Sequence, residues 1–159
     1  MITIIGGTYF EYCKDPTWEH LYGSGLRAAA ALSNIGQKVK FRSCVAERDL
    51  QTAQSICSTF NISAVFKIIP KTIAFHYYHP LSSPTANPDI PIEKQISLDE
   101  IKAESILQYG MLEAYTKVAA IRAVYDPQNG IQFSANGSTS KHLAIVLNKK
   151  ERSEERRVG

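Results

Sequence analysis

The fold of this chain is decided by the stretch Tyr22-Gly-Ser-Gly-Leu-Arg-Ala-Ala-Ala-Ala-Leu-Ser-Asn-Ile-Gly36. Alanine favours helix and takes little space, so the pattern predicts a helix over 25–35 that can lie close against a sheet. We expect Ser24 to cap the start of this helix and Gly36 to follow its end in the left-handed conformation. The stretch is typical of a core helix, and equally of a helix whose free N–H groups face a ligand.

Strands and helices alternate on both sides of this helix. Apolar or alternating runs predict strands over 2–5, 9–13, 37–44, 64–69, 72–78, 105–109, 123–125 and 141–147. A second helix is predicted over 49–60, capped by Asp49, and the composition of 111–121 predicts a third. Segments 14–21 and 79–91 are expected to be loops. This order predicts an α/β domain with a largely parallel sheet.

Composition narrows the class of protein. The 159 residues are 44% hydrophobic and 21% charged, which fits one globular domain. The net charge is only +3 with scattered basic residues, so no nucleic acid partner is expected. No apolar run approaches the roughly 20 residues of a membrane span. Three cysteines without metal-ligand spacing favour a reduced, cytoplasmic protein.

Four segments, taken in order, resemble the ribokinase-like (PfkB) carbohydrate and nucleoside kinases. They are Ile4-Ile-Gly-Gly-Thr-Tyr-Phe-Glu11, the glycine-flanked helix 23–36, Val124-Tyr-Asp-Pro127 and Val146-Leu-Asn-Lys-Lys-Glu151. The resemblance covers the chain up to Glu151. One position departs from it, because Arg27 stands where the family usually carries Asn.

The resemblance implies an α/β fold, a ribokinase-like three-layer α/β/α sandwich with a small β lid. Lid elements would occupy about 9–22 and 72–98. Residues 1–151 would be the N-terminal part of the kinase domain, incomplete at its C-terminus. The dense charge run 152–159 is expected to be a non-native or disordered tail.

The function that the resemblance implies is an ATP-dependent kinase that phosphorylates a hydroxyl of a sugar or nucleoside-like substrate. Substrate contacts would come from Glu11, Gly23, Gly25, Arg27, His76 and Tyr78. Each has a simpler interpretation: Glu11 as a surface acid, Arg27 as a solvated helix residue, the two glycines as parts of a capped core helix, and the aromatic strand 74–79, which contains His76 and Tyr78, as sheet core. A homodimer through the lid is a further expectation.

The cofactors implied are ATP and Mg²⁺. Asn148 and Glu151 would organise the magnesium through water, since that ion keeps much of its hydration shell. Their spacing is also that of a helix capping box. The family's catalytic base lies in a Gly-x-Gly-Asp segment that this sequence does not contain, so we expect the fragment to be inactive alone. The alternative is a non-catalytic, kinase-fold protein that binds a ligand or regulates a partner.

Overall fold

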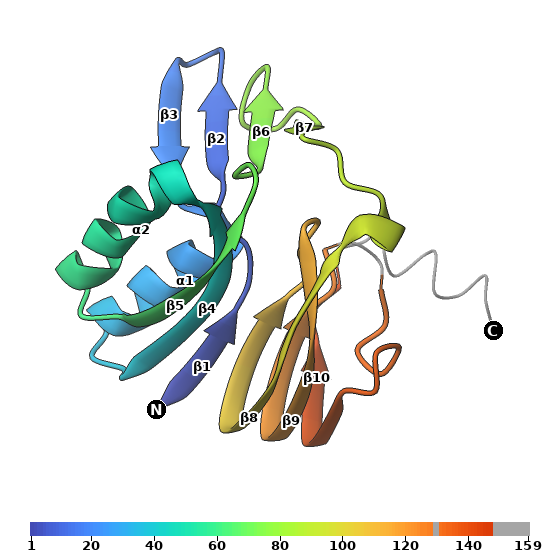
Figure 1. The fold of residues 1–159 in the computed structure, drawn as a ribbon. Coiled ribbons are helices and arrows are strands. Elements are labelled where there is room, and N and C mark those ends of the chain that lie inside the picture. Colours follow the sequence, from blue (N-terminus) through green and yellow to red (C-terminus); the bar gives the residue numbers. More distant parts are fainter. Residues whose placement is uncertain (129–130, 148–159) are drawn as a thin grey trace.

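The computed structural model describes residues 1–128 and 131–147. The first part of the chain alternates strands with two helices, and the last part is built from three strands (Figure 1). The elements are β1 (Ile2–Ile5), β2 (Phe10–Cys13), β3 (Trp18–Leu21), α1 (Gly23–Asn34), β4 (Val39–Ala46), α2 (Glu47–Thr59), β5 (Ser63–Ile69), β6 (Ala74–Tyr77), β7 (Thr85–Asn87), the 3-10 turn η1 (Ile92–Lys94), β8 (Ile96–Tyr109), β9 (Ala114–Asp126) and β10 (Thr139–Ile145).

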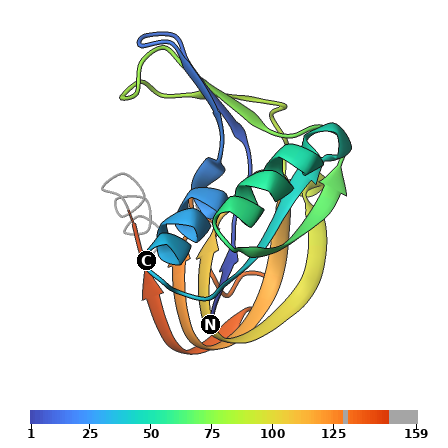
Figure 2. The same ribbon diagram turned by 90° about the vertical axis from the view of Figure 1, so that its left-hand side faces the viewer.

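The large sheet has six strands in the order β10-β9-β8-β1-β4-β5, and every neighbouring pair is parallel. Helices α1 and α2 lie side by side on one face of it (Figure 2). Their apolar sides bury Leu26 and Cys57 against Ile4 and Phe41 of the sheet. The parallel sheet flanked by helices confirms the predicted α/β class.

The face of the large sheet opposite the helices is covered by parts of β8 and β9. The N–H of Gly110 donates to the carbonyl of Asp126 (2.8 Å), and that of Ile96 donates to the carbonyl of Glu113 (3.0 Å). Glu113 follows closely after the end of β8 in the chain, so its contact with Ile96 brings the two ends of β8 close together. A straight strand of its 14 residues would span about 45 Å. β8 and β9 both curve back on themselves (Figures 1 and 2). Their first halves form the layer opposite the helices.

A second core lies between the two strand layers. Ile106, Ala123 and Tyr125 face it from the second halves of β8 and β9, and Ala114 and Val118 face it from the first half of β9. The helix predicted over 111–121 is therefore wrong. Buried and exposed residues alternate at the start of β9, which is the period of a strand rather than of a helix.

A small mixed sheet, in the order β3-β2-β6-β7, lies above the carboxyl ends of the large sheet (Figure 1). Two of its strands, β3 and β7, fall in segments that were expected to be loops. Residues 96–98 of the second expected lid segment pair with β9 in the large sheet instead. The small sheet is thus formed by residues 10–21 and 74–87.

The helix ends differ from the sequence expectations in two details. α1 begins at Gly23, so Ser24 lies inside it and Tyr22 takes the N-cap position without a side-chain hydrogen bond. α2 begins before Asp49, whose Oδ2 accepts a hydrogen bond from Oγ1 of Thr72 (2.7 Å) and so ties α2 to the chain leading into β6. Gly36 follows α1 with a φ of +82°, as predicted.

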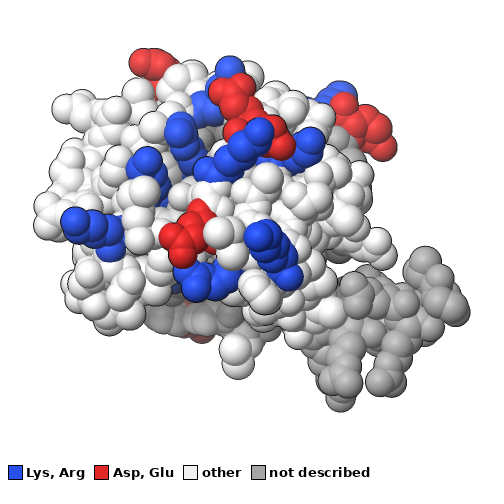
Figure 3. Space-filling view, turned by 90° about the horizontal axis from the view of Figure 1, so that it is seen from below, with Lys and Arg blue, Asp and Glu red and all other residues white. Residues whose placement is uncertain are grey.

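The surface of the described residues carries charges of both signs. Seen from below, basic side chains outnumber the acidic ones among which they lie (Figure 3). Within residues 1–128 and 131–147, no helix has the length and hydrophobicity needed to cross a membrane.

Candidate functional site

The turn after β1 and the start of α1 touch through glycine backbone. The N–H of Gly25 donates to the carbonyl of Gly7 (3.1 Å). A Cβ on Gly25 would lie 2.6 Å from the carbonyl carbon of Gly6, and one on Gly23 would lie 2.5 Å from the carbonyl oxygen of Gly7. Gly23 also has a φ of +71°, which favours glycine. These glycines bring the helix start against the sheet, and the Gly25 N–H is used within the protein.

Glu11 is buried beside this glycine contact. It lies on β2 with 6% of its surface exposed, and its Oε2 forms an ion pair with Nη2 of Arg27 on α1. The Arg27 side chain is 57% exposed. Arg27 therefore compensates the buried carboxylate while its own charge stays in contact with solvent.

Aromatic rings extend the site toward the large sheet. Tyr9 packs edge-on against Phe75 of β6, with 4.7 Å between ring centroids. A Cβ added to Gly7 or Gly23 would come within 2.8 Å of the Tyr9 ring, so this ring fills the space that both glycines leave. Burial raises the pKa of the Tyr9 hydroxyl.

A cavity of about 120 Å³ adjoins Tyr9 and Phe75 at the carboxyl edge of the sheet. Residues of the small sheet, of the turn after β1 and of the connections that follow β8 and β9 surround it: Gly7, Tyr9, Ile73, Phe75, Gly110, Met111, Leu112, Glu113 and Gln128. Ligands of open parallel sheets bind at this edge, outside the carboxyl ends of the strands. The cavity is therefore the natural place for a small ligand.

Glu113 is the acidic residue of this cavity wall. It is 4% exposed, and among the described residues its Oε1 has no hydrogen-bond partner. Burial raises its pKa from 4.5 to about 7. A buried polar atom without a partner is rare in proteins, and a bound group is one explanation for it. In the described part of the chain, Thr8, Ser24, Ser43 and Gln108 each carry such an atom as well, but Glu113 is the one that lines this cavity.

The structure brings together four of the residues expected to contact substrate, namely Glu11, Gly23, Gly25 and Arg27. His76 pairs with Tyr12 in the register of the small sheet and stacks on it at 4.9 Å, on the face opposite to Glu11. Tyr78 lies beyond β6 and is 62% exposed. None of the six residues expected to contact substrate lines the cavity. Asn148 and Glu151, expected to organise magnesium, and the tail 152–159 lie outside the described residues.

Three residues of the site were missed by sequence reasoning: Tyr9, Phe75 and Glu113. A signal existed for Glu113, because it follows the buried run 105–109 and Gly110, and an acid just after a buried parallel strand faces the ligand edge of the sheet. Assigning 111–121 to a helix concealed it. Phe75 was part of the expected aromatic strand, and its alternation with His76 placed one of the two on each face.

Metal ligands are not gathered in the described part of the chain. Residues 1–128 and 131–147 contain no group of three or more His, Cys, Asp or Glu side chains that could hold a metal ion. The three cysteines are free and buried, and burial raises the pKa of Cys44 to about 12 and that of Cys57 to about 11. These two thiols are therefore core residues rather than nucleophiles.

No protein-family model and no curated protein sequence matches the chain. Solved structures do match it. A nucleoside kinase from Methanocaldococcus jannaschii, an archaeal member of the ribokinase family, is 12% identical with a TM-score of 0.63, over 98% of this chain and 63% of that one. A ribokinase from Cryptococcus neoformans in complex with ADP is 11% identical with a TM-score of 0.60, over 96% and 60%.

A third match is a pyrophosphate-dependent kinase in the ribokinase family, complexed with a pyrophosphate analogue and myo-inositol. It is 16% identical with a TM-score of 0.55, over 86% of this chain and 52% of that one. These likenesses establish that the chain has the ribokinase-like fold, as its sequence motifs indicated. The chain spans less than two thirds of the length of each of the three.

Proposed function

We propose that this chain forms the acceptor-binding part of a phosphotransferase that acts on a hydroxyl group of a sugar or nucleoside-like molecule. The observation that carries the proposal is the buried Glu113 carboxyl in a cavity at the carboxyl edge of the sheet, where its Oε1 has no hydrogen-bond partner among the described residues. The matching solved structures include a ribokinase, a nucleoside kinase and a kinase complexed with myo-inositol, which supports the same class of acceptor.

The chemistry of the cavity suits a polyhydroxylated ring. An ionised Glu113 accepts hydrogen bonds from hydroxyl groups, and such bonds favour the charged form of a carboxyl whose pKa burial has raised. Phe75 and Tyr9 offer apolar surface against which a ring can pack. Bound hydroxyls would thus supply the partners that the Glu113 carboxyl lacks.

The ion pair between Arg27 and Glu11 limits the charge that the proposed acceptor can carry. Its guanidinium is engaged by Glu11, so binding a phosphorylated or acidic acceptor through Arg27 would leave the Glu11 carboxylate buried without its partner. We therefore propose a neutral acceptor whose hydroxyls are held by Glu113, with the Glu11–Arg27 pair kept intact outside the cavity.

The donor side of the reaction belongs to residues that the structure does not describe. ATP and Mg²⁺ remain the proposed cofactors, with Asn148 and Glu151 as the residues that would organise the metal. The described residues would bind and orient the acceptor and exclude water from it. The phosphoryl transfer itself is assigned to none of them.

Titration of the 159-residue chain with myo-inositol, ribose and adenosine, followed by NMR, tests the proposal. We expect at least one of the three to bind and to shift the resonances of Phe75 and Glu113. Glu113→Gln and Phe75→Ala should each weaken that binding by about tenfold, the loss of one strong polar contact or ring contact. His76→Ala, on the other face of the same strand, is the matched control and should leave it unchanged.

A folded chain that binds none of the three acceptors would overturn the proposal. The kinase step is tested separately on the complete protein, by assaying ATP-dependent phosphorylation of the acceptor that binds. Binding without phosphorylation would favour the non-catalytic, ligand-binding alternative over the kinase.

A further inference from the structure

We propose that a second cleft, between the β4–β5 part of the large sheet and the first half of β8, binds a small zwitterion of the size of a free amino acid. The cleft measures about 170 Å³ and shares no residue with the cavity beside Glu113. Its walls carry Arg42 and Lys67 on one side and Asp99 and Glu100 on the other. The inference stands on this cleft alone and does not depend on the proposed kinase function.

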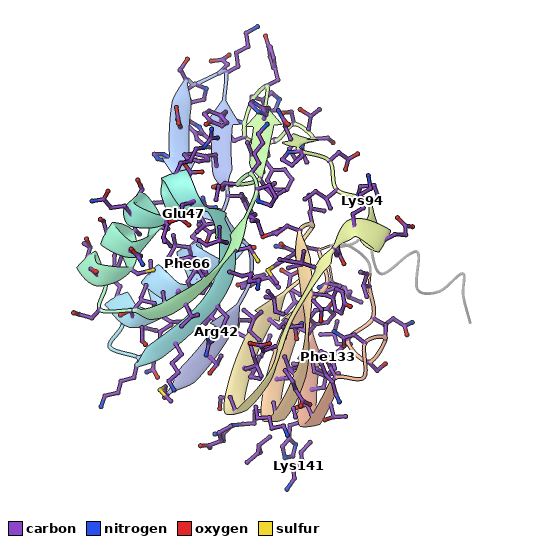
Figure 4. All side chains as sticks on the ribbon, viewed as in Figure 1. Arg42, Glu47, Phe66, Lys94, Phe133 and Lys141 are labelled. Atoms are coloured by element: carbon purple, nitrogen blue, oxygen red, sulfur yellow. The ribbon has the colours of Figure 1, made fainter. Side chains whose placement is uncertain are left out.

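The cationic wall comes from the face of the sheet that the helices do not cover. Arg42 lies opposite Val65, and Lys67 lies two residues further along β5 (Figure 4 labels Arg42). Alternation along the strands turns the neighbouring Phe41 and Phe66 toward the helices and the two cations the other way. In the described part of the chain, neither cation forms a salt bridge or a side-chain hydrogen bond.

The acidic wall is produced by an irregularity in β8. The register between β8 and β9 shifts between Leu98 and Ile101, so Asp99 and Glu100 leave the ladder. Oγ1 of Thr116 donates to the carbonyl oxygen of Asp99 (2.8 Å) and holds the bulge in place. Bulges of this kind re-aim side chains and occur often beside binding sites.

The two acids differ in their partners. Glu100 forms salt bridges with Lys102 (3.6 Å) and Lys117 (3.4 Å). The carboxylate of Asp99 has no side-chain partner within residues 1–128 and 131–147. Arg42, Lys67 and Asp99 are all exposed to solvent, and within the described residues no ion pair joins the acid to either cation across the cleft.

This arrangement selects a ligand that carries both charges. An anion held by Arg42 and Lys67 would lie near the Asp99 carboxylate, and a cation held by Asp99 would lie near the two basic groups. A molecule with a carboxylate and an ammonium group satisfies both walls, while Val65 and Leu98 accept its carbon skeleton. The volume is below the roughly 300 Å³ at which drug-sized sites begin, which limits the ligand to the size of an amino acid.

Saturation-transfer NMR on the 159-residue chain with glycine, L-serine, L-leucine, L-lysine and L-glutamate tests the inference. We expect at least one of these amino acids to bind, and acetate and methylamine, which carry one charge each, to bind at least about tenfold more weakly. Arg42→Gln and Asp99→Asn should each reduce the affinity by a similar factor. Lys141→Gln, an exposed lysine on β10 outside the cleft (Figure 4), is the control and should change nothing.

Three results would overturn the inference. The first is that none of the five amino acids binds, and the second is that binding persists in both Arg42→Gln and Asp99→Asn. The third is that acetate binds as tightly as the amino acids and Asp99→Asn leaves its binding intact, which would define an anion site instead. Circular dichroism of each variant separates a lost site from a lost fold.

Discussion

Two carboxyl groups are buried at the carboxyl edge of the sheet, and their surroundings differ. Glu11 comes from the small sheet and is paired with Arg27 of α1. Glu113 comes from the short connection between two curved strands, and among the described residues its Oε1 has no partner. Their exposed fractions are nearly equal, at 6% and 4%. The two carboxyl groups therefore differ in whether a cationic side chain compensates their charge, not in how deeply they are buried.

This difference is the basis for proposing that Glu11 is a structural acid and Glu113 a binding acid. A buried charge with a partner ties two elements together, here β2 and α1, and has little capacity left for a ligand. A buried acid without a partner lowers stability and gains from any group that completes its hydrogen bonds. The proposed ligand therefore lies on the Glu113 side, whereas sequence reasoning placed it on the Glu11 side.

The largest loss of stability is expected from Gly25→Ala, which disrupts the glycine contact between the start of α1 and the turn after β1. Gly25→Ala would place a Cβ within 2.6 to 2.8 Å of the Gly6 backbone, and neither strand nor helix can yield. We expect a loss of about 4 kcal/mol or more in the free energy of unfolding, or a chain that does not fold. Urea unfolding followed by circular dichroism measures it.

Gly36→Ala is the matched control for Gly25→Ala. A Cβ on Gly36 meets nothing within 4 Å, and its only cost is the positive φ, about 1 kcal/mol. If the two substitutions reduce the free energy of unfolding equally, the glycine contact is not close-packed. That result would contradict the proposal that this contact fixes α1 against the turn after β1.

The next effect concerns the Glu113 side and depends on pH. Because its folded-state pKa, about 7, exceeds the usual 4.5, folding takes up a proton between these values. The free energy of unfolding should therefore fall as the pH rises from about 4.5 through 7, by a total of about 3 kcal/mol. Glu113→Gln should abolish this fall, as measured by urea titrations at pH 4.5, 6 and 8. If the free energy of unfolding depends on pH in the same way in the variant and in the parent chain, the pKa of the Glu113 carboxyl is not raised in the folded state.

The smallest effect comes from breaking the compensated pair. Arg27→Met leaves the Glu11 carboxylate buried without its partner, and we expect a cost of about 1 kcal/mol because Arg27 is more than half exposed. The double variant Glu11→Gln/Arg27→Met should recover most of that loss. A double-mutant cycle measures the coupling between the two residues. A coupling near zero would contradict the structural role assigned to Glu11.

Local signals were sufficient to predict the first part of the fold. The segments around β1, α1, β4, α2 and β5 carry apolar periodicity, alanine-rich helix or strand alternation, and their bounds were found to within a few residues. The order of these elements implied a parallel sheet, because a strand–helix–strand unit returns the second strand in the same direction. The alanine-rich helix was likewise predicted to lie close against a sheet, and the structure brings its start, at Gly23 and Gly25, against the turn after β1.

Local signals failed where long-range contacts decided the outcome. Segment 111–121 contains good helix formers, and only its packing against Ile106, Ala123 and Tyr125 makes it a strand. No local sequence pattern predicts that β8 folds back on itself and brings Ile96 to Glu113. The sequence by itself determined a ribokinase-like α/β fold with a glycine-flanked helix. Only the tertiary structure decided that Arg27 compensates Glu11 and that Glu113 stays unpaired, since both depend on residues that folding brings together from different elements.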